Sequence, residues 1–319
     1  MRSPREAAGR REPTSVNGSD LSGYSIEALV GTGGMAEVYR AVAVAGPEAG
    51  RTVAVKRLRP ELARDASYVA LFAQEAEITR RLRHPGIVEV LETGVAAGTP
   101  FIVMEYVDGR NLKQILAQCA ARGILLPVDF AAYVAHVVAD ALAHAHAGRD
   151  EAGAPLGIVH CDVSPSNVFI SRLGEIKLGD FGVARAAGAA AASPGGAVGK
   201  IHYLAPELIR GARPTPASDI FALGAVFFEL LTNAPAFPGA DVNAVGQRIL
   251  AGTLRAPSEV RSEVPFELDS MVLRCIAADP AWRFPTAEAF ARELATLYDP
   301  AVGTPLAIAA VVRGLFGAR

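Results

Sequence analysis

The pattern of apolar and polar residues predicts strands in the first third of the chain. Between residues 24 and 105, short runs rich in β-branched residues are bounded by glycine and proline, which is typical of strands. These runs are YSIEALV, EVYRAVAV, TVAVKRL, IVEVLETG and PFIVME. One helix is predicted among them, over residues 66–83, because Phe72, Ile78 and Leu82 form an apolar stripe at helical spacing.

Helical spacing dominates after residue 111. Pro127 stands where a helix is expected to begin, and apolar residues recur behind it every three or four positions. These residues are Phe130, Val134, Val137, Val138, Ala141 and Leu142. Further helices are predicted over residues 216–232, 241–251, 266–277 and 286–297. The pattern therefore predicts an α+β protein in which a small strand-rich lobe precedes a larger helical lobe.

Composition excludes several classes of protein. The chain has 319 residues, is 51% apolar and carries a formal net charge of −2. It can therefore bury a large core, and it lacks the basic field that holds nucleic acid. Cys119, Cys161 and Cys275 lie far apart without metal-binding or redox spacing, so we expect reduced thiols in a cytoplasmic protein. The apolar run over residues 305–312 is too short to span a membrane.

We expect three segments along the chain. Residues 1–20 are basic and polar and are predicted to form a flexible arm, while residues 21–298 form the domain, with its lobes over 21–105 and 106–298. Residues 299–319 form an apolar helical tail, which is expected to dock on the domain or on a partner.

Candidate chemistry begins with a glycine-rich turn and a strand lysine. Gly31, Gly33 and Gly34 lie between two predicted strands and could let the backbone approach phosphate oxygens. Taken alone, these glycines are better explained as an ordinary hairpin turn. Lys56 lies on the strand VAVK, and Glu75 lies on the following helix, near enough to pair if that helix packs on the sheet. Each of these two charges, taken alone, is better explained as a solvated surface group.

Carboxylates and an amide follow in the helical part. The stretch HCDVSPSN contains Asp162 and Asn167, DFG begins at Asp180, and YLAPE ends at Glu207. Carboxylate and amide oxygens suit a magnesium-nucleotide site. Each signal is weak alone, but together they occur in one fixed order.

In that order the motifs resemble the eukaryotic-like protein kinases, and specifically the bacterial serine/threonine kinases of this family. The resemblance covers about residues 24–297 and implies the bilobal kinase fold, ATP and Mg²⁺ as cofactors, and protein substrates. It places the nucleotide against Gly31, Thr32, Gly33, Gly34, Val38, Ala54, Lys56, Met104, Glu105, Val107, Asn111 and Phe169. Ala36 departs from the pattern, because the family usually has a third glycine there.

The resemblance also implies individual roles. Lys56 would hold two phosphates of ATP and pair with Glu75, Asp162 would accept the proton of the substrate hydroxyl, and Asn167 and Asp180 would hold Mg²⁺. Glu207 would pair with Arg283, and Asp219 would brace the catalytic loop.

Two positions of the site depart from the family together. Ser164 stands where the usual loop has a lysine, and Lys200 stands where the segment before APE usually has a threonine. Lysine is scarce, with only Lys56, Lys113, Lys177 and Lys200 among 31 basic residues. We therefore predict that the hydroxyl and the ammonium have exchanged places, and that Lys200 hydrogen-bonds both Asp162 and Ser164. A solvent-exposed Lys200 is the alternative.

The residues expected to regulate activity through the activation loop depart from the family pattern at two places. Cys161 replaces the arginine that binds an activation-loop phosphate in many relatives, and the alanine- and glycine-rich segment 186–199 has one hydroxyl, Ser193, so activity is expected not to depend on phosphorylation there. Two other functions stay open as alternatives to an active protein kinase. They are a pseudokinase scaffold and a small-molecule phosphotransferase. We interpret His136, His144 and His146 as ordinary helix residues rather than metal ligands.

Overall fold

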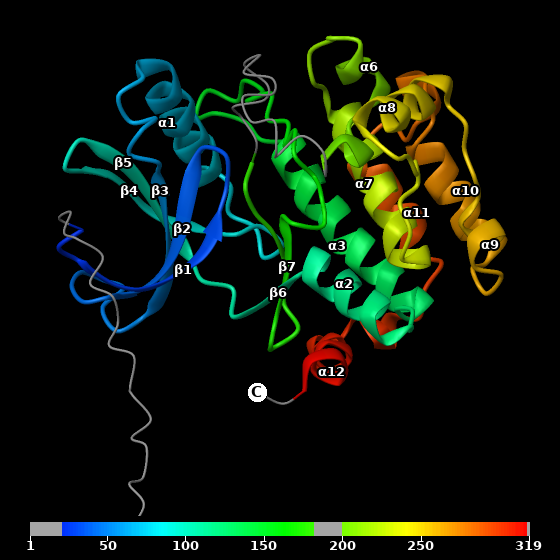
Figure 1. Ribbon diagram of the computed structural model, residues 1–319, viewed down its shortest axis with the longest axis horizontal. Helices are drawn as coiled ribbons and strands as arrows, with labels where there is room; N and C mark the ends of the chain where they lie inside the picture. The colour runs from blue at the N-terminus through cyan, green and yellow to red at the C-terminus, as the bar shows by residue number, and fades with distance from the viewer. Residues whose placement is uncertain (1–20, 182–199, 318–319) are drawn as a thin grey trace, which may run out of the picture.

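The computed structural model describes residues 21–181 and 200–317. Its ribbon shows a strand-rich lobe beside a larger helical lobe (Figure 1), which confirms the predicted α+β class. The smaller lobe contains an antiparallel sheet of order β1-β2-β3-β5-β4 with one helix, α1, packed near β4 and β5. The bounds of these elements are β1 Tyr24–Thr32, β2 Ala36–Ala43, β3 Thr52–Leu58, α1 Ala66–Arg80, β4 Val90–Ala96 and β5 Thr99–Glu105.

Alternation along β3 explains where Lys56 points. Val53 and Val55 are fully buried in an apolar cluster on one face of the sheet. Leu58, two positions beyond Lys56, packs with Phe72 of α1 in a cluster on the other face. Because side chains alternate between the faces of a strand, Lys56 shares the face of Leu58 and points toward α1.

The helical lobe is built around α3 and α7, which pack against each other in this lobe (Figure 1). Nearly every residue of α7 is buried, which explains its continuous apolar sequence. The bounds in this lobe are β6 Gly109–Asn111, α2 Leu112–Arg122, α3 Val128–His146, β7 Val168–Ser171, β8 Ile176–Leu178, η1 Ile201–Tyr203, α6 Pro206–Ile209, α7 Pro216–Thr232, α8 Val242–Ala251, α9 Pro257–Val260, α10 Phe266–Cys275, η2 Pro280–Trp282, α11 Ala287–Leu294, η3 Pro300–Gly303 and α12 Pro305–Phe316.

Helix starts agree with the predictions better than helix ends do. The helix predicted over residues 216–232 has the observed bounds of α7, and α3 begins directly after Pro127. In contrast, α1 ends at Arg80 and α11 at Leu294, three residues before the predicted ends. The apolar stripe misled the prediction because Leu82 and Leu297 continue to pack on the core after the helices have ended.

The last helix, α12, packs on α2 and β7 of the helical lobe. Its buried residues Ile308, Val312 and Leu315 join the main core. Gly174, at φ +88° in the β7–β8 turn, allows the start of α12 to approach, because a Cβ there would lie 1.8 Å from the Pro305 carbonyl oxygen. Among the described residues, none of the helices has the length and apolar character needed to cross a membrane.

Candidate active site

Lys56 joins three elements at the junction of the lobes. Its Nζ donates to Glu75 Oε1 of α1 at 2.5 Å and to Asp180 Oδ1, which follows β8, at 2.9 Å. Burial alone would lower the pKa of Lys56, but the carboxylates of Asp180 and Glu75 raise it above its ordinary value. The ammonium of Lys56 in turn lowers the pKa of Asp180. Burial raises the pKa of Glu75, although the ammonium of Lys56 opposes this shift. The shifts of Lys56 and Asp180 both favour their charged forms.

Two residues of the site have left-handed backbone conformations. Cys161 has φ +64° and Asp180 has φ +58°. For residues other than glycine this conformation costs roughly 1–3 kcal/mol, and it persists only where surrounding contacts enforce it. Such residues cluster at functional sites. Here Cys161 directly precedes Asp162, and Asp180 is itself the second candidate carboxylate.

The expected catalytic loop, residues 160–167, is held in place by contacts from α7, as predicted. The carboxylate of Asp219, which is only 1% exposed, accepts the backbone N–H of His160 at 2.7 Å and that of Cys161 at 2.9 Å. His146 of α3 donates from Nε2 to the same carboxylate at 2.8 Å. The interpretation of His146 as an ordinary helix residue is therefore wrong, because α3 packs against α7 and brings the imidazole to Asp219.

His160 links the two carboxylates of the site. Its Nε2–H donates to the carbonyl oxygen of Gly179 at 3.1 Å, and its Nδ1 accepts the backbone N–H of Asp162 at 3.2 Å. Burial lowers the pKa of His160, which favours the neutral ring that these two bonds require. The imidazole thus fixes the backbone beside Asp180 and at Asp162.

Asn167 and Lys200 both contact Asp162. The Nδ2 of Asn167 donates to the backbone oxygen of Asp162 at 2.8 Å and to its Oδ2 at 3.0 Å. Lys200 Nζ also donates to Asp162 Oδ2, forming an ion pair. The predicted contact between Lys200 and Asp162 is thus present.

The predicted hydrogen bond between Lys200 and Ser164 is wrong. Ser164 is 2% exposed, and its Oγ has no hydrogen-bond partner within the described ranges. The Lys200 side chain is 40% exposed and pairs with Asp162 alone of these two loop residues. Lys200 therefore contacts the carboxylate but not the buried hydroxyl.

The residues expected around the nucleotide come from both lobes. Gly31 and Thr32 end β1, Gly33 and Gly34 form the turn, Val38 is on β2, Ala54 and Lys56 are on β3, Met104 and Glu105 end β5, Val107 precedes β6, Asn111 ends β6 and Phe169 is on β7. Strand register pairs Val38 with Lys56 and Ala54 with Met104. The Oδ1 of Asn111 accepts the N–H of Gln114 at 2.9 Å, so this oxygen is used to cap α2.

The connection between the lobes contains an ion pair that the sequence analysis missed. Lys177 Nζ of β8 donates to Glu105 Oε1 at 2.7 Å, and the side chains are only 14% and 15% exposed. The same oxygen accepts the backbone N–H of Glu89 at 2.8 Å. The scarcity of lysine was the available signal, because Lys56, Lys177 and Lys200 all lie in this region.

Asn167 and Asp180 fit a magnesium site completed by phosphate. The nitrogen of Asn167 is committed to Asp162, which leaves its amide oxygen as the atom that could ligate a cation. Over the described ranges, no group of three or more His, Cys, Asp or Glu side chains is arranged to hold a metal ion. Mg²⁺ characteristically uses one or two protein ligands together with substrate phosphates, which matches this pair of oxygen donors.

The predicted pair of Glu207 and Arg283 is present. Arg283 donates two hydrogen bonds of 2.8 Å to the carboxylate of Glu207. Cys161 is half-buried, and its Sγ donates to the Val159 carbonyl at 3.4 Å. The arm 1–20, Gly182 of the DFG motif, and the segment 186–199 with Ser193 lie outside the described residues.

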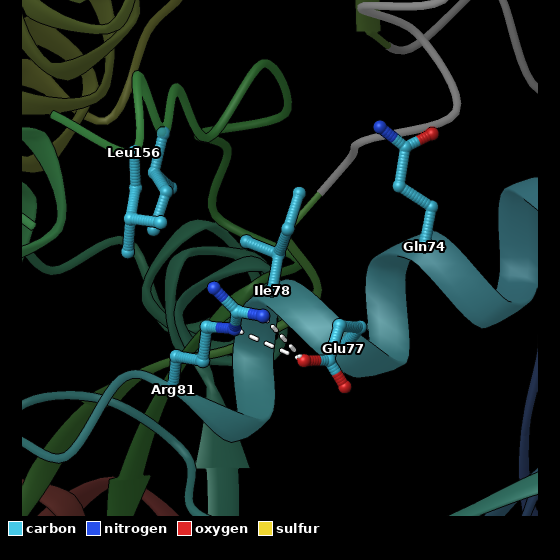
Figure 2. Close-up of a pocket in the computed structure, with 6 residues that line it drawn as sticks. Gln74, Glu77, Ile78, Arg81 and Leu156 are labelled. Atoms are coloured by element: carbon cyan, nitrogen blue, oxygen red, sulfur yellow. Dashed lines mark hydrogen bonds and ion pairs between the residues drawn. The ribbon is translucent and has the colours of Figure 1, made fainter. Parts of the chain in front are cut away.

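A separate small pocket lies between α1 and the segment before the catalytic loop (Figure 2). It has a volume of about 240 Å³ and is lined by Gln74, Glu77, Ile78, Arg81, Leu156 and Ile158. Glu77 is two positions beyond Glu75 and therefore faces another side of the helix. The pocket is thus distinct from the site around Lys56.

Comparisons with known proteins agree with the fold and the site. The protein kinase domain family matches residues 24–294. The tyrosine-protein kinase MasK of Myxococcus xanthus is 35% identical over 297 residues, which are 92% of this chain and 46% of that protein. The serine/threonine-protein kinase PrkC of Bacillus subtilis is 36% identical over 284 residues, covering 88% and 42%. The chain thus spans less than half the length of these relatives.

Among solved structures, the kinase domain of PknI from Mycobacterium tuberculosis is similar to this chain. It has a TM-score of 0.64 and 30% sequence identity over 86% of this chain and 96% of that domain. The chain belongs to the protein kinase domain family.

Proposed function

We propose that this chain transfers the γ-phosphoryl group of ATP to serine or threonine hydroxyls of protein substrates. The observation that carries the proposal is the linkage of Lys56 to both Glu75 and Asp180, which joins the two lobes through charged groups. Phosphoryl transfer depends on positioning and charge neutralisation more than on covalent chemistry. A linked lysine and carboxylates beside a second carboxylate, Asp162, suit those needs.

Each residue has a place in the proposed reaction. The substrate hydroxyl oxygen forms a bond to the γ-phosphorus, the bond from that phosphorus to the leaving oxygen of ADP breaks, and the hydroxyl proton passes to Asp162. Lys56 would hold phosphates of the nucleotide, and Asn167 and Asp180 would hold Mg²⁺, which would neutralise phosphate charge. Asn167 and His160 keep Asp162 in position through the hydrogen bonds described above.

Support for serine and threonine comes from relatives. PrkC is named a serine/threonine kinase, whereas MasK is named a tyrosine kinase, so the choice of hydroxyl needs a direct test. Lys56, Asp162 and Asp180 take part in the ion pairs described above, which argues against the scaffold alternative. Contacts of α12 with α2 support docking of the tail on the domain itself, which we take as residues 21–298. A cytoplasmic location and the absence of a nucleic-acid partner stay predictions from the sequence.

The test is transfer of labelled phosphate from Mg-ATP to peptides that differ only in serine, threonine or tyrosine. We expect transfer to serine and threonine, and we expect Asp162→Asn to lower kcat by about 10²–10⁴-fold because the amide cannot accept the proton. Lys113→Met, an exposed lysine of α2, is the matched control and should behave as wild type. Near-normal turnover of Asp162→Asn would remove the assigned base, and transfer only to tyrosine would overturn the proposed specificity.

A further inference from the structure

The transfer end of the site, which is the region around Asp162 where the phosphoryl group is expected to move, needs a positive charge. In the proposed reaction the γ-phosphoryl group, itself anionic, approaches the carboxylate of Asp162. Two negative groups within a few ångströms repel each other, and preorganised cations aimed at the developing charge are a major source of catalysis. The question is which side chain provides that cation.

The catalytic loop itself does not provide it. The stretch HCDVSPSN, residues 160–167, contains no lysine or arginine. Its histidine, His160, is buried and uses both ring nitrogens for backbone contacts that require the neutral ring. Ser164 is buried, its Oγ has no hydrogen-bond partner among the residues that the structure describes, and it carries no charge. Lys56 is already shared between Glu75 and Asp180.

Lys200 brings an ammonium to this end of the site. It is paired with Asp162 Oδ2, and its side chain is still 40% exposed. An ammonium has three donors, so a contact with one carboxylate oxygen leaves two for another acceptor. Lys200 can therefore keep its contact with Asp162 and also face an arriving phosphate.

The segment that carries Lys200 is anchored to the helix that braces the catalytic loop. In η1, directly after Lys200, the hydroxyl of Tyr203 donates to Glu229 Oε2 at 2.5 Å. The Nδ1–H of His202 donates to the carbonyl oxygen of Phe237 at 3.0 Å. Glu229 belongs to α7, which also carries Asp219, the brace of the catalytic loop. A single buried helix thus sets the position of Lys200 relative to Asp162.

We propose that Lys200 supplies the positive charge at the transfer end, holding Asp162 before the reaction and facing the γ-phosphoryl group during transfer. This inference rests on the proposed kinase function. Lys200 keeps its protons throughout, and the hydroxyl proton still passes to Asp162. The cation needed near the base therefore comes from a segment 38 residues away in sequence, because the loop position of Ser164 supplies only a neutral hydroxyl.

The test compares Lys200→Met, Lys200→Arg and Lys113→Met with the wild type. We expect Lys200→Met to lower kcat by about 10²–10³-fold, the usual cost of removing one preorganised donor to developing charge. The KM for ATP and the affinity for Mg-ATP should change by less than about threefold, since Lys56 and Asp180 hold the nucleotide. Lys200→Arg, which keeps the charge, should retain more activity than Lys200→Met, and Lys113→Met should match the wild type.

The charge-retaining variant separates a charge from a purely structural role. We expect Lys200→Arg to keep at least about tenfold more of the kcat than Lys200→Met at a similar melting temperature, because both side chains are long but only arginine returns the positive charge. If Lys200→Met turns over within about threefold of wild type, or loses activity only together with its melting temperature and nucleotide affinity, the inference is overturned while the kinase function stands. A wild-type chain that transfers no phosphate overturns the proposed function, and the role of Lys200 with it.

Discussion

The two ends of the site bind their lysines through different contacts. The nucleotide end is the region around Lys56, and the transfer end is the region around Asp162 and Lys200. Lys56 is 13% exposed and bridges two carboxylates from separate elements, whereas Lys200 is 40% exposed and pairs with one, Asp162. Ion pairs that are shielded from water interact more strongly and are screened less by salt. The difference indicates a fixed cation where the nucleotide binds and an adaptable cation where the phosphoryl group moves.

The largest expected effect separates the two lysines by their contribution to stability. We expect Lys56→Met to lower kcat/KM for ATP by about 10²–10³-fold and also to lower the melting temperature, because Glu75 and Asp180 are left beside each other without a counter-charge. Lys200→Met should affect turnover alone. Phosphate transfer and thermal unfolding, measured on both variants and on Lys113→Met, test this. Equal melting temperatures for the two site variants would contradict the comparison.

The nucleotide end could be predicted from sequence because its signals are local. The strand VAVK fixes which face carries Lys56, and a helix follows that brings Glu75 to the same face. Continuous burial of α7 likewise appears as a continuous apolar sequence. Periodicity was sufficient to predict the burial of α7. The pairing of Lys56 with Glu75 was predicted from the resemblance, because either charge taken alone is better explained as a solvated surface group.

The transfer end was predicted less completely because it depends on contacts between distant elements. The contact of Lys200 with Asp162 was predicted from the paired departures from the family pattern at Ser164 and Lys200, with the scarcity of lysine as support. The burial of Ser164 depends on how the loop backbone turns, which no local pattern reports. His146 was missed for a related reason. Its partner, Asp219, is on α7, and the sequence does not show that α3 crosses α7 at that position.

A middle-sized effect is expected at the connection between the lobes. In Lys177→Met the carboxylate of Glu105 would stay largely buried but would lose its ion-pair partner. Glu105 is one of the residues that the resemblance places against the nucleotide. We expect the KM for ATP to rise by about three- to tenfold, equivalent to roughly 1 kcal/mol, while kcat changes by less than about twofold. This is the opposite of the pattern expected for Lys200→Met. Steady-state kinetics with varied ATP check it, and a change in kcat alone would place Lys177 at the transfer end instead.

The smallest expected effect concerns His160, which contacts both ends of the site. Burial lowers its pKa, although the carboxylates of Asp219 and Asp162 oppose the shift. The unfolded chain, with a histidine pKa of about 6.5, therefore binds a proton at a higher pH than the folded chain. The stability that neutral His160 contributes is present above that pKa and is lost as the pH falls below it toward the folded value.

We expect the free energy of unfolding of the wild type to decrease between pH 7.5 and 5.5 by about 1 kcal/mol more than that of His160→Gln. Glutamine is the matched replacement because its amide can still donate to the Gly179 carbonyl and accept from the N–H of Asp162, yet does not titrate. Burial also lowers the pKa of His84, but His84 is present in both proteins, so its contribution cancels in the difference. Denaturant titrations at the two pH values measure both slopes. Because protonation would remove the Nδ1 acceptor that holds Asp162, equal slopes would mean that His160 is not the group that couples the two ends of the site to pH.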